Sequence, residues 1–134
     1  AMEANKKVES FMELLNKKIY EAKDMLIERY RYIISQNPTS AQFMYENNIM
    51  LGYDGKNIES AMKHGTLAVG QLGLAETLRI LIGKDQTTEE GMQLAKRIEQ
   101  LFKDRCSEFK KKYRLNFGVY YTPECNIYHL WGLV

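Results

Sequence analysis

The chain has 134 residues, of which 45% are hydrophobic and 27% are charged, a balance typical of one globular domain. Nineteen basic and seventeen acidic residues give a formal net charge of +2, which offers no electrostatic argument for binding nucleic acid or a membrane surface. No apolar stretch reaches the roughly twenty residues that span a bilayer, so we expect a cytoplasmic protein.

The two cysteines carry no metal or disulfide signature. Cys106 falls in a helical pattern and Cys125 in a C-terminal loop, too far apart in the chain for a disulfide framework or a paired metal site. We therefore expect reduced thiols, as in the cytoplasm, and no metal or cofactor held by this chain.

Apolar side chains recur every three or four positions from Val8 to Ile33. This spacing predicts one long amphipathic helix near residues 5–36, which should end before Pro38 because proline disfavours helical geometry in the residue that precedes it. Residues 41–57 combine aromatic and methionine side chains with Asn, Asp and Gly, and predict a packed loop with at most a short helical turn at its start. The loop aromatics are expected either to cover the local core or to contact a ligand.

The stretch "HGTLAVGQLGLAETLRILIG" (residues 64–83) predicts a strand that begins at Thr66 and passes directly into a helix that ends at Gly83. Three glycines lie along this junction: Gly65, Gly70 and Gly73. Their spacing matches neither the dinucleotide-binding fingerprint nor the P-loop, which excludes nucleotide binding by either motif. We expect Gly73 to let the helix and strand backbones approach closely.

A second long amphipathic helix is predicted near residues 88–113, with Thr87 and Glu90 at capping-box spacing. Its apolar stripe consists of Leu94, Ile98, Leu101, Phe102, Cys106, Phe109 and Tyr113. The basic residues at its end, 110–112 and Arg114, complement the helix dipole, which we favour over a nucleic-acid patch.

Alternating residues from Phe117 to Tyr121 predict a second short strand, which Thr122 and Pro123 end. A strand, two helices and a strand form a parallel crossover unit, and parallel sheets need several strands with helices on both faces. The predicted fold class is therefore mainly α, with long amphipathic helices and two short strands that form part of a larger α/β domain.

Few residues suggest chemistry of their own. His64, His129 and Glu76 lie outside any nucleophile or metal signature, and we assign them no catalytic role. Thr122 and Pro123 form a turn at the carboxyl edge of the predicted sheet, which is where α/β folds place ligands. On the residues alone, this position is only slightly favoured over an ordinary turn.

Three segments, "NPTSAQFMYENN", "HGTLAVGQLGLAETLRILIGK" and "YRLNFGVYYTPE", occur in this order along the chain. Together they resemble consecutive stretches of the catalytic subunit of the anaerobic, glycyl-radical (class III) ribonucleoside-triphosphate reductase, from Lys7 to Pro123. The resemblance implies that the chain is a fragment of a ten-stranded α/β barrel, whose parent reduces ribonucleotides to deoxyribonucleotides by glycyl-radical chemistry. It also implies that Thr122 and Pro123 lead into a helix whose N-terminus holds substrate phosphates.

The same resemblance places the catalytic cysteines, the glycyl-radical loop and the zinc site of the family outside this sequence, and residues 124–134 depart from the family pattern. We therefore expect a single partial domain, residues 1–134, that is a truncated segment of the reductase without catalytic residues or activity of its own. The alternative is a stand-alone, non-catalytic helical interaction module. Weak binding of nucleotide phosphates at Thr122 is a third interpretation.

Uncovered strand edges and apolar helix faces favour association. Apolar residues are concentrated near the C-terminus: Phe117, Val119, Tyr121, Ile127, Leu130, Trp131 and Leu133. We therefore expect a homodimer with the C-terminal segment at or near the contact, and the remainder of the reductase as a second partner. Neither nucleic acid nor a membrane is expected as a partner.

Overall fold

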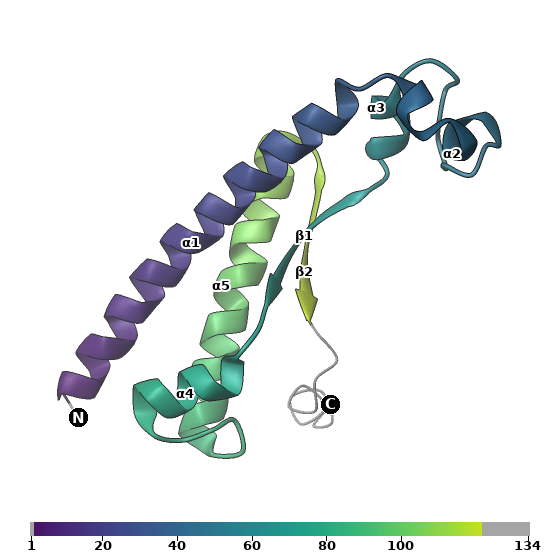
Figure 1. Ribbon diagram of the computed structural model, residues 1–134. Coiled ribbons are helices and arrows are strands. Elements are labelled where there is room, and N and C mark those ends of the chain that lie inside the picture. Colours follow the sequence, from purple (N-terminus) through teal and green to yellow (C-terminus); the bar gives the residue numbers. More distant parts are fainter. Residues whose placement is uncertain (1, 122–134) are drawn as a thin grey trace.

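The computed structural model describes residues 2–121, which form two long helices, three short ones, one 3₁₀ turn and two strands (Figure 1). The elements are α1 (Met2–Ile34), η1 (Pro38–Ala41), α2 (Gln42–Glu46), α3 (Ile58–Met62), β1 (Thr66–Gln71), α4 (Leu74–Ile82), α5 (Glu89–Tyr113) and β2 (Asn116–Tyr121). The predicted class, mainly helical with two short strands, is confirmed.

The long helices α1 and α5 lie side by side and form one layer (Figure 1). Their apolar stripes face each other, and the ring of Tyr20 on α1 meets the ring of Phe109 on α5 edge-on, with centroids 5.3 Å apart. Phe109 is 1% exposed and also packs against Phe117 of β2. The centre of the core is therefore the place where the two helices meet the sheet.

Local backbone conformation and side-chain hydrogen bonds define the C-terminal end of α1 and the N-terminal end of α5. Asn37 takes an extended conformation before Pro38, and its side chain accepts a hydrogen bond from the Thr39 backbone N–H, so α1 cannot continue. The capping box predicted at Thr87 is wrong by one residue. Thr88 caps α5 by accepting from the Gly91 N–H, while the Thr87 hydroxyl donates to the Asp85 side chain.

A small lobe formed by η1, α2, α3 and their connecting loops lies beyond the C-terminal end of α1 (Figure 1). It has its own core, made of Tyr45, Ile58 and Ala61, and the rings of Tyr45 and Tyr53 pack with centroids 4.8 Å apart. These two aromatics cover the local core, as one of the two sequence interpretations expected. Phe43 does not, because its side chain is exposed.

The strands β1 and β2 pair in parallel, in a register that joins Thr66 to Asn116 and Gln71 to Tyr121. Val69 and Phe117 are buried against the helices, whereas Tyr120 is exposed. The sheet has two strands within residues 2–121, and helices cover only one of its faces. A two-stranded sheet does not by itself show the barrel that the resemblance implies.

Candidate functional site

The carboxyl edge of the sheet is the first candidate site. Because β1 and β2 are parallel and Gln71 pairs with Tyr121, the carboxyl ends of both strands lie together. The first turn of α4 begins three residues after Gln71. Thr122 and Pro123 follow Tyr121 directly, but they lie outside the described residues, so the phosphate contact predicted there stays a prediction.

Gly73 connects β1 to α4 in the left-handed conformation, with φ of 75°. A Cβ on Gly73 would be 3.7 Å from the nearest atom, the carboxylate oxygen Oε2 of Glu76, which is an ordinary contact. The expected role in close helix–strand packing is therefore wrong, and the positive φ explains the glycine. Glu76 lies in the first turn of α4 and places its own carboxylate where the helix dipole would attract an anion.

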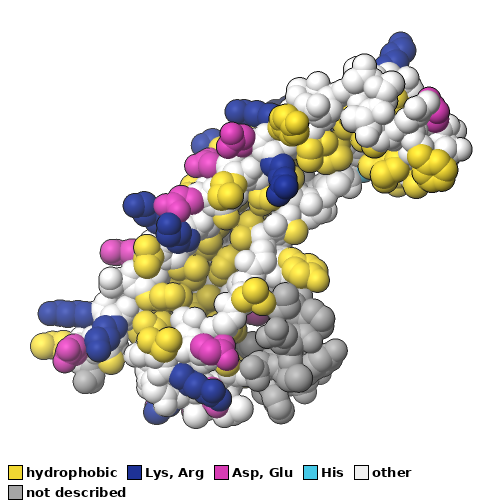
Figure 2. All heavy atoms as spheres, in the orientation of Figure 1, with side chains coloured by type: hydrophobic (Ala, Val, Ile, Leu, Met, Phe, Trp, Pro, Cys, Tyr) yellow, Lys and Arg dark blue, Asp and Glu magenta, His cyan; other side chains and the backbone are white. Residues whose placement is uncertain are grey.

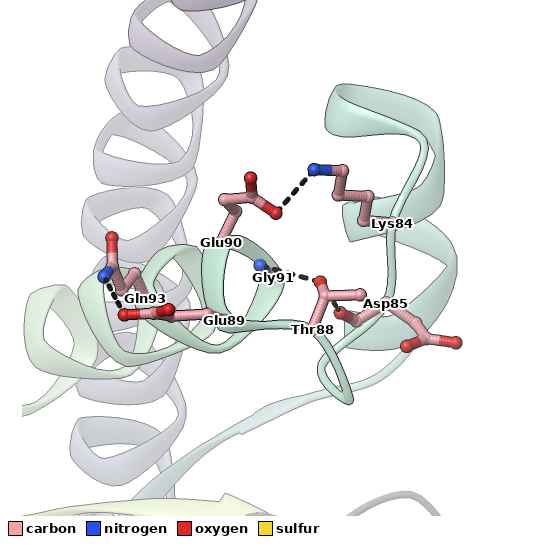
Figure 3. A network of polar contacts seen from close by, with 7 residues as sticks. All are labelled: Lys84, Asp85, Thr88, Glu89, Glu90, Gly91 and Gln93. Carbon is pink, nitrogen blue, oxygen red and sulfur yellow. Dashed lines mark hydrogen bonds and ion pairs between the residues drawn. The ribbon is translucent and has the colours of Figure 1, made fainter.

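The start of α5 holds a second polar cluster (Figure 3). The Thr88 hydroxyl donates to the Asp85 backbone oxygen at 2.8 Å and accepts from the Gly91 N–H at 3.2 Å. Lys84 binds Glu90 at 2.5 Å, and this hydrogen bond holds the pKa of Glu90 below its ordinary value. The Thr88 hydroxyl, the Gly91 N–H, Lys84 and Glu90 all have partners within this turn, so these groups cap the start of α5.

A buried cation joins the two long helices. Lys23 is 7% exposed, and its Nζ lies 5.6, 5.7 and 5.4 Å from the ring centroids of Tyr20, Phe109 and Tyr113. It also donates to the Tyr113 hydroxyl at 3.2 Å and pairs with Asp24 at 2.5 Å. The hydrogen bond to Asp24 is the main cause that raises the pKa of Lys23. The ammonium group therefore stays protonated and holds α1 against α5.

A polar chain continues from this cage along the same interface. The Tyr20 hydroxyl donates to Glu108 at 2.7 Å, and Arg105 donates to Glu108 at 2.5 Å and to Asn16 at 2.7 Å. The hydrogen bonds from Tyr20 and Arg105 hold the pKa of Glu108 below its ordinary value. Glu108 is therefore ionised at neutral pH and is unsuited to act as a general acid.

No cluster of three or more His, Cys, Asp or Glu within residues 2–121 could hold a metal ion. Over the same residues, no helix has the length and apolar character needed to cross a bilayer. The carboxyl edge of the sheet is a position where the sequence and the topology both indicate a site.

The family model for anaerobic ribonucleoside-triphosphate reductase matches residues 1–127. The chain belongs to this family. A search among curated proteins gave no match. The family predicted from the three sequence segments is therefore confirmed, and the match includes the positions of Thr122 and Pro123 without assigning a role to either.

Within this reductase family member, Cys106 is the cysteine that the structure describes. Its side chain is buried in the core beside α1, and burial raises the pKa of the Cys106 thiol above its ordinary value. A buried thiol of raised pKa is a poor nucleophile.

Cys106 should react slowly with a thiol-alkylating reagent at neutral pH while the chain is folded, because its thiolate is disfavoured and its side chain is enclosed. In a Cys125→Ser background, unfolding with guanidinium chloride is expected to raise the alkylation rate at least about tenfold. Mass spectrometry over time measures both rates. Equal rates in the folded and unfolded chain would show that Cys106 is accessible.

Sequence reasoning did not find the buried lysine. A signal exists, because Lys23 lies four residues after Ile19 and four before Ile27, both of which are buried. A charged residue at the centre of an apolar stripe indicates that its side chain is buried beside groups that stabilise the charge. The sequence does not reveal that this set is a cage of three aromatic rings drawn from two helices.

Proposed function

We propose that the chain is a truncated segment of the catalytic subunit of an anaerobic ribonucleoside-triphosphate reductase, that it forms part of the subunit's α/β barrel, and that it is inactive alone. The observation that carries this proposal is the family match over residues 1–127. The parallel sheet supports it, because two parallel strands covered on one face are the kind of unit that a larger barrel completes.

In the parent, the family resemblance implies reduction of ribonucleotides by glycyl-radical chemistry. The contribution of this segment would be structural: β1, α4, α5 and β2 form one crossover unit of the barrel wall. The Lys23 cage and the Glu108 chain hold α1 on the same layer as α5. No catalytic residue, metal ligand or cofactor contact is proposed for this chain.

A substrate contact at Thr122 and Pro123 belongs to the same proposal. Thr122 follows Tyr121, the last residue of β2, and Tyr121 pairs with Gln71 at the carboxyl edge of the sheet, which is where α/β folds place ligands. A hydroxyl and the backbone N–H groups of a following helix would suit phosphate oxygens. This contact would operate in the assembled barrel, where the rest of the substrate site is present.

The purified chain is expected to form no deoxyribonucleotide under strict anaerobic conditions, even with an activating enzyme, S-adenosylmethionine and formate as reductant. The physical reason is that the radical and cysteine sites implied by the resemblance lie outside this sequence. Chromatography of the nucleotide products measures the outcome. Product that forms with the chain and disappears with a Thr122→Ala variant would overturn the proposed inactivity.

A stand-alone interaction module is the second candidate, and one observation favours it. The lobe beyond α1 exposes four large apolar side chains on neighbouring turns: Phe43, Met44, Ile49 and Leu51.

A complementation assay separates the two candidate functions. If a reductase subunit that lacks the matching region regains activity when this chain is added, the barrel segment is supported. If the chain binds without restoring activity, the module is supported.

A further inference from the structure

A pocket opens in the small lobe that η1, α2, α3 and their connecting loops form. Its volume is about 370 Å³, near the lower end of the range of about 300–1,000 Å³ that is typical of small-molecule sites. Its walls come from η1, from Gln42, Tyr45 and Glu46 of α2, and from Tyr53 and Gly55 in the loop before α3. The lobe precedes β1, so the pocket lies at the amino end of the strands, away from the carboxyl edge of the sheet.

Two tyrosine rings line the pocket. The ring centroids of Tyr45 and Tyr53 are 4.8 Å apart, and their planes are tilted by 56°. Tyr45 is 7% exposed and belongs to the lobe core with Ile58 and Ala61, and Tyr53 packs against that core. The core therefore fixes both rings before any ligand binds. The face of a tyrosine ring carries a negative potential, which attracts an organic cation within about 6 Å of the ring centroid.

Glu46 gives the pocket a negative charge. Among the described residues that line the pocket, Glu46 alone is charged. Gln42, one turn earlier on α2, donates a hydrogen bond to Oε1 of Glu46 at 2.7 Å and so positions the carboxylate. Within residues 2–121, Glu46 forms no ion pair. The pocket thus combines aromatic rings with a carboxylate that lacks a basic partner in this part of the chain.

Two other cavities of the described chain each contain a basic side chain. The groove between α1 and β1 is lined by both Glu28 and Arg29. The cavity between α1 and α5 is lined by Glu9 and Arg97, which bind each other at 2.8 Å. On the face that Figure 2 shows, charged side chains crowd the flank of α1 and are sparse on the lobe. A cation can therefore enter the lobe pocket without displacing a basic side chain of the lining.

We propose that this pocket binds a small organic cation, an ammonium group with apolar substituents, whose charge lies against the Tyr53 ring and the Glu46 carboxylate. A metal ion fits poorly, because Ca²⁺ takes about six to eight oxygen ligands and no cluster of three His, Cys, Asp or Glu within residues 2–121 could hold one. The inference goes beyond the proposed function, because the pocket uses neither the barrel nor the substrate contact.

A comparison of choline with its neutral carbon analogue, in which carbon replaces the quaternary nitrogen, tests the proposal. Each compound is titrated into the isotope-labelled chain, and amide NMR spectra report the binding. Choline is expected to shift the amide signals of Tyr45, Glu46 and Tyr53 to saturation, with a dissociation constant below about 10 mM. The two compounds have the same shape, so the neutral analogue should bind at least about tenfold more weakly if charge is recognised.

Variants of the pocket separate the carboxylate from the ring. Glu46→Gln removes the charge and keeps the size of the side chain, and should weaken choline binding at least about fivefold without changing the affinity for the neutral analogue. Tyr53→Leu removes the ring and should weaken choline binding by a similar factor. Tyr53→Phe keeps the ring and should bind choline within about twofold of wild type.

Two matched controls lie in the same lobe but outside the pocket lining. Glu59→Gln makes the same charge change on α3, and Phe43→Leu removes an exposed ring from α2, so both should bind choline as wild type does. The amide spectra also show whether each variant keeps the fold of the lobe. If Tyr53→Leu does not, Glu46→Gln and the neutral analogue still decide.

Three results would each overturn the proposal: no saturable shift with choline, equal affinities for choline and its neutral analogue, or wild-type affinity for choline in Glu46→Gln. None of these results bears on the proposed function, which the activity and complementation assays test.

Discussion

Replacing Phe109 with alanine is expected to lower the free energy of unfolding by about 3–5 kcal/mol, the usual cost of removing a fully buried phenylalanine. Phe109 is 1% exposed and lies where α1, α5 and β2 meet. Its ring makes edge contacts with Tyr20 and Phe117, at centroid distances of 5.3 and 5.5 Å. It also forms one wall of the cage around Lys23. Alanine would leave a cavity and remove an aromatic face from a buried cation.

Urea unfolding followed by far-UV circular dichroism measures this change. Phe43→Ala is the matched control, because the same atoms are removed from a side chain that is 71% exposed, and we expect a change within about 0.5 kcal/mol. If both variants unfold at the same urea concentration as the wild type, Phe109 does not lie in the core. If Phe109→Ala lowers the free energy of unfolding by well more than the expected range, the Lys23 cage and the ring contacts are coupled.

The long elements could be predicted because their signals repeat over many residues. The apolar stripe expected near residues 88–113 became α5, Glu89–Tyr113, and the helix expected near residues 5–36 became α1, Met2–Ile34. A period that repeats over many turns tolerates a few exceptions. The exceptions are informative: Leu101 is only partly buried at the edge of the stripe, whereas Phe102 is buried.

Local details were harder to predict, because they depend on contacts between segments. Gly73 is required by its own positive φ and not by close packing, a difference that spacing cannot show. The Thr88 cap depends on how the Asp85 turn folds back onto α5, although Thr87 offers the same hydroxyl one residue earlier. The candidate site at Thr122 and Pro123 rests on the family resemblance, since a Thr-Pro turn alone does not specify phosphate binding.

Gly91→Ala is expected to destabilise the chain by about 2–4 kcal/mol, although alanine is the best helix former and Gly91 lies within α5. An ideal Cβ at Gly91 would lie 1.8 Å from the Asp85 carbonyl oxygen and 2.8 Å from Thr88 Oγ1. Because the Asp85 carbonyl belongs to the backbone, a side-chain rotation cannot remove the clash. The turn from Asp85 to Thr88 would have to move, which costs about 1–3 kcal/mol for overpacking. Loss of the Thr88 cap adds about 1 kcal/mol.

Two further variants, measured in the same urea series, separate the contributions to the free energy change of Gly91→Ala. Gly70→Ala is the matched glycine control, because its Cβ would be 3.5 Å from the Tyr120 carbonyl oxygen, an ordinary contact. We expect that variant to be neutral or slightly stabilised, by up to about 1 kcal/mol. Thr88→Ala removes the cap alone and should cost about 1 kcal/mol. If Gly91→Ala costs no more than Thr88→Ala, the turn yields to the added methyl group and the close approach of Asp85 to α5 does not constrain the fold. If it costs clearly more, the approach of two backbones at this turn is what requires a glycine at the start of α5.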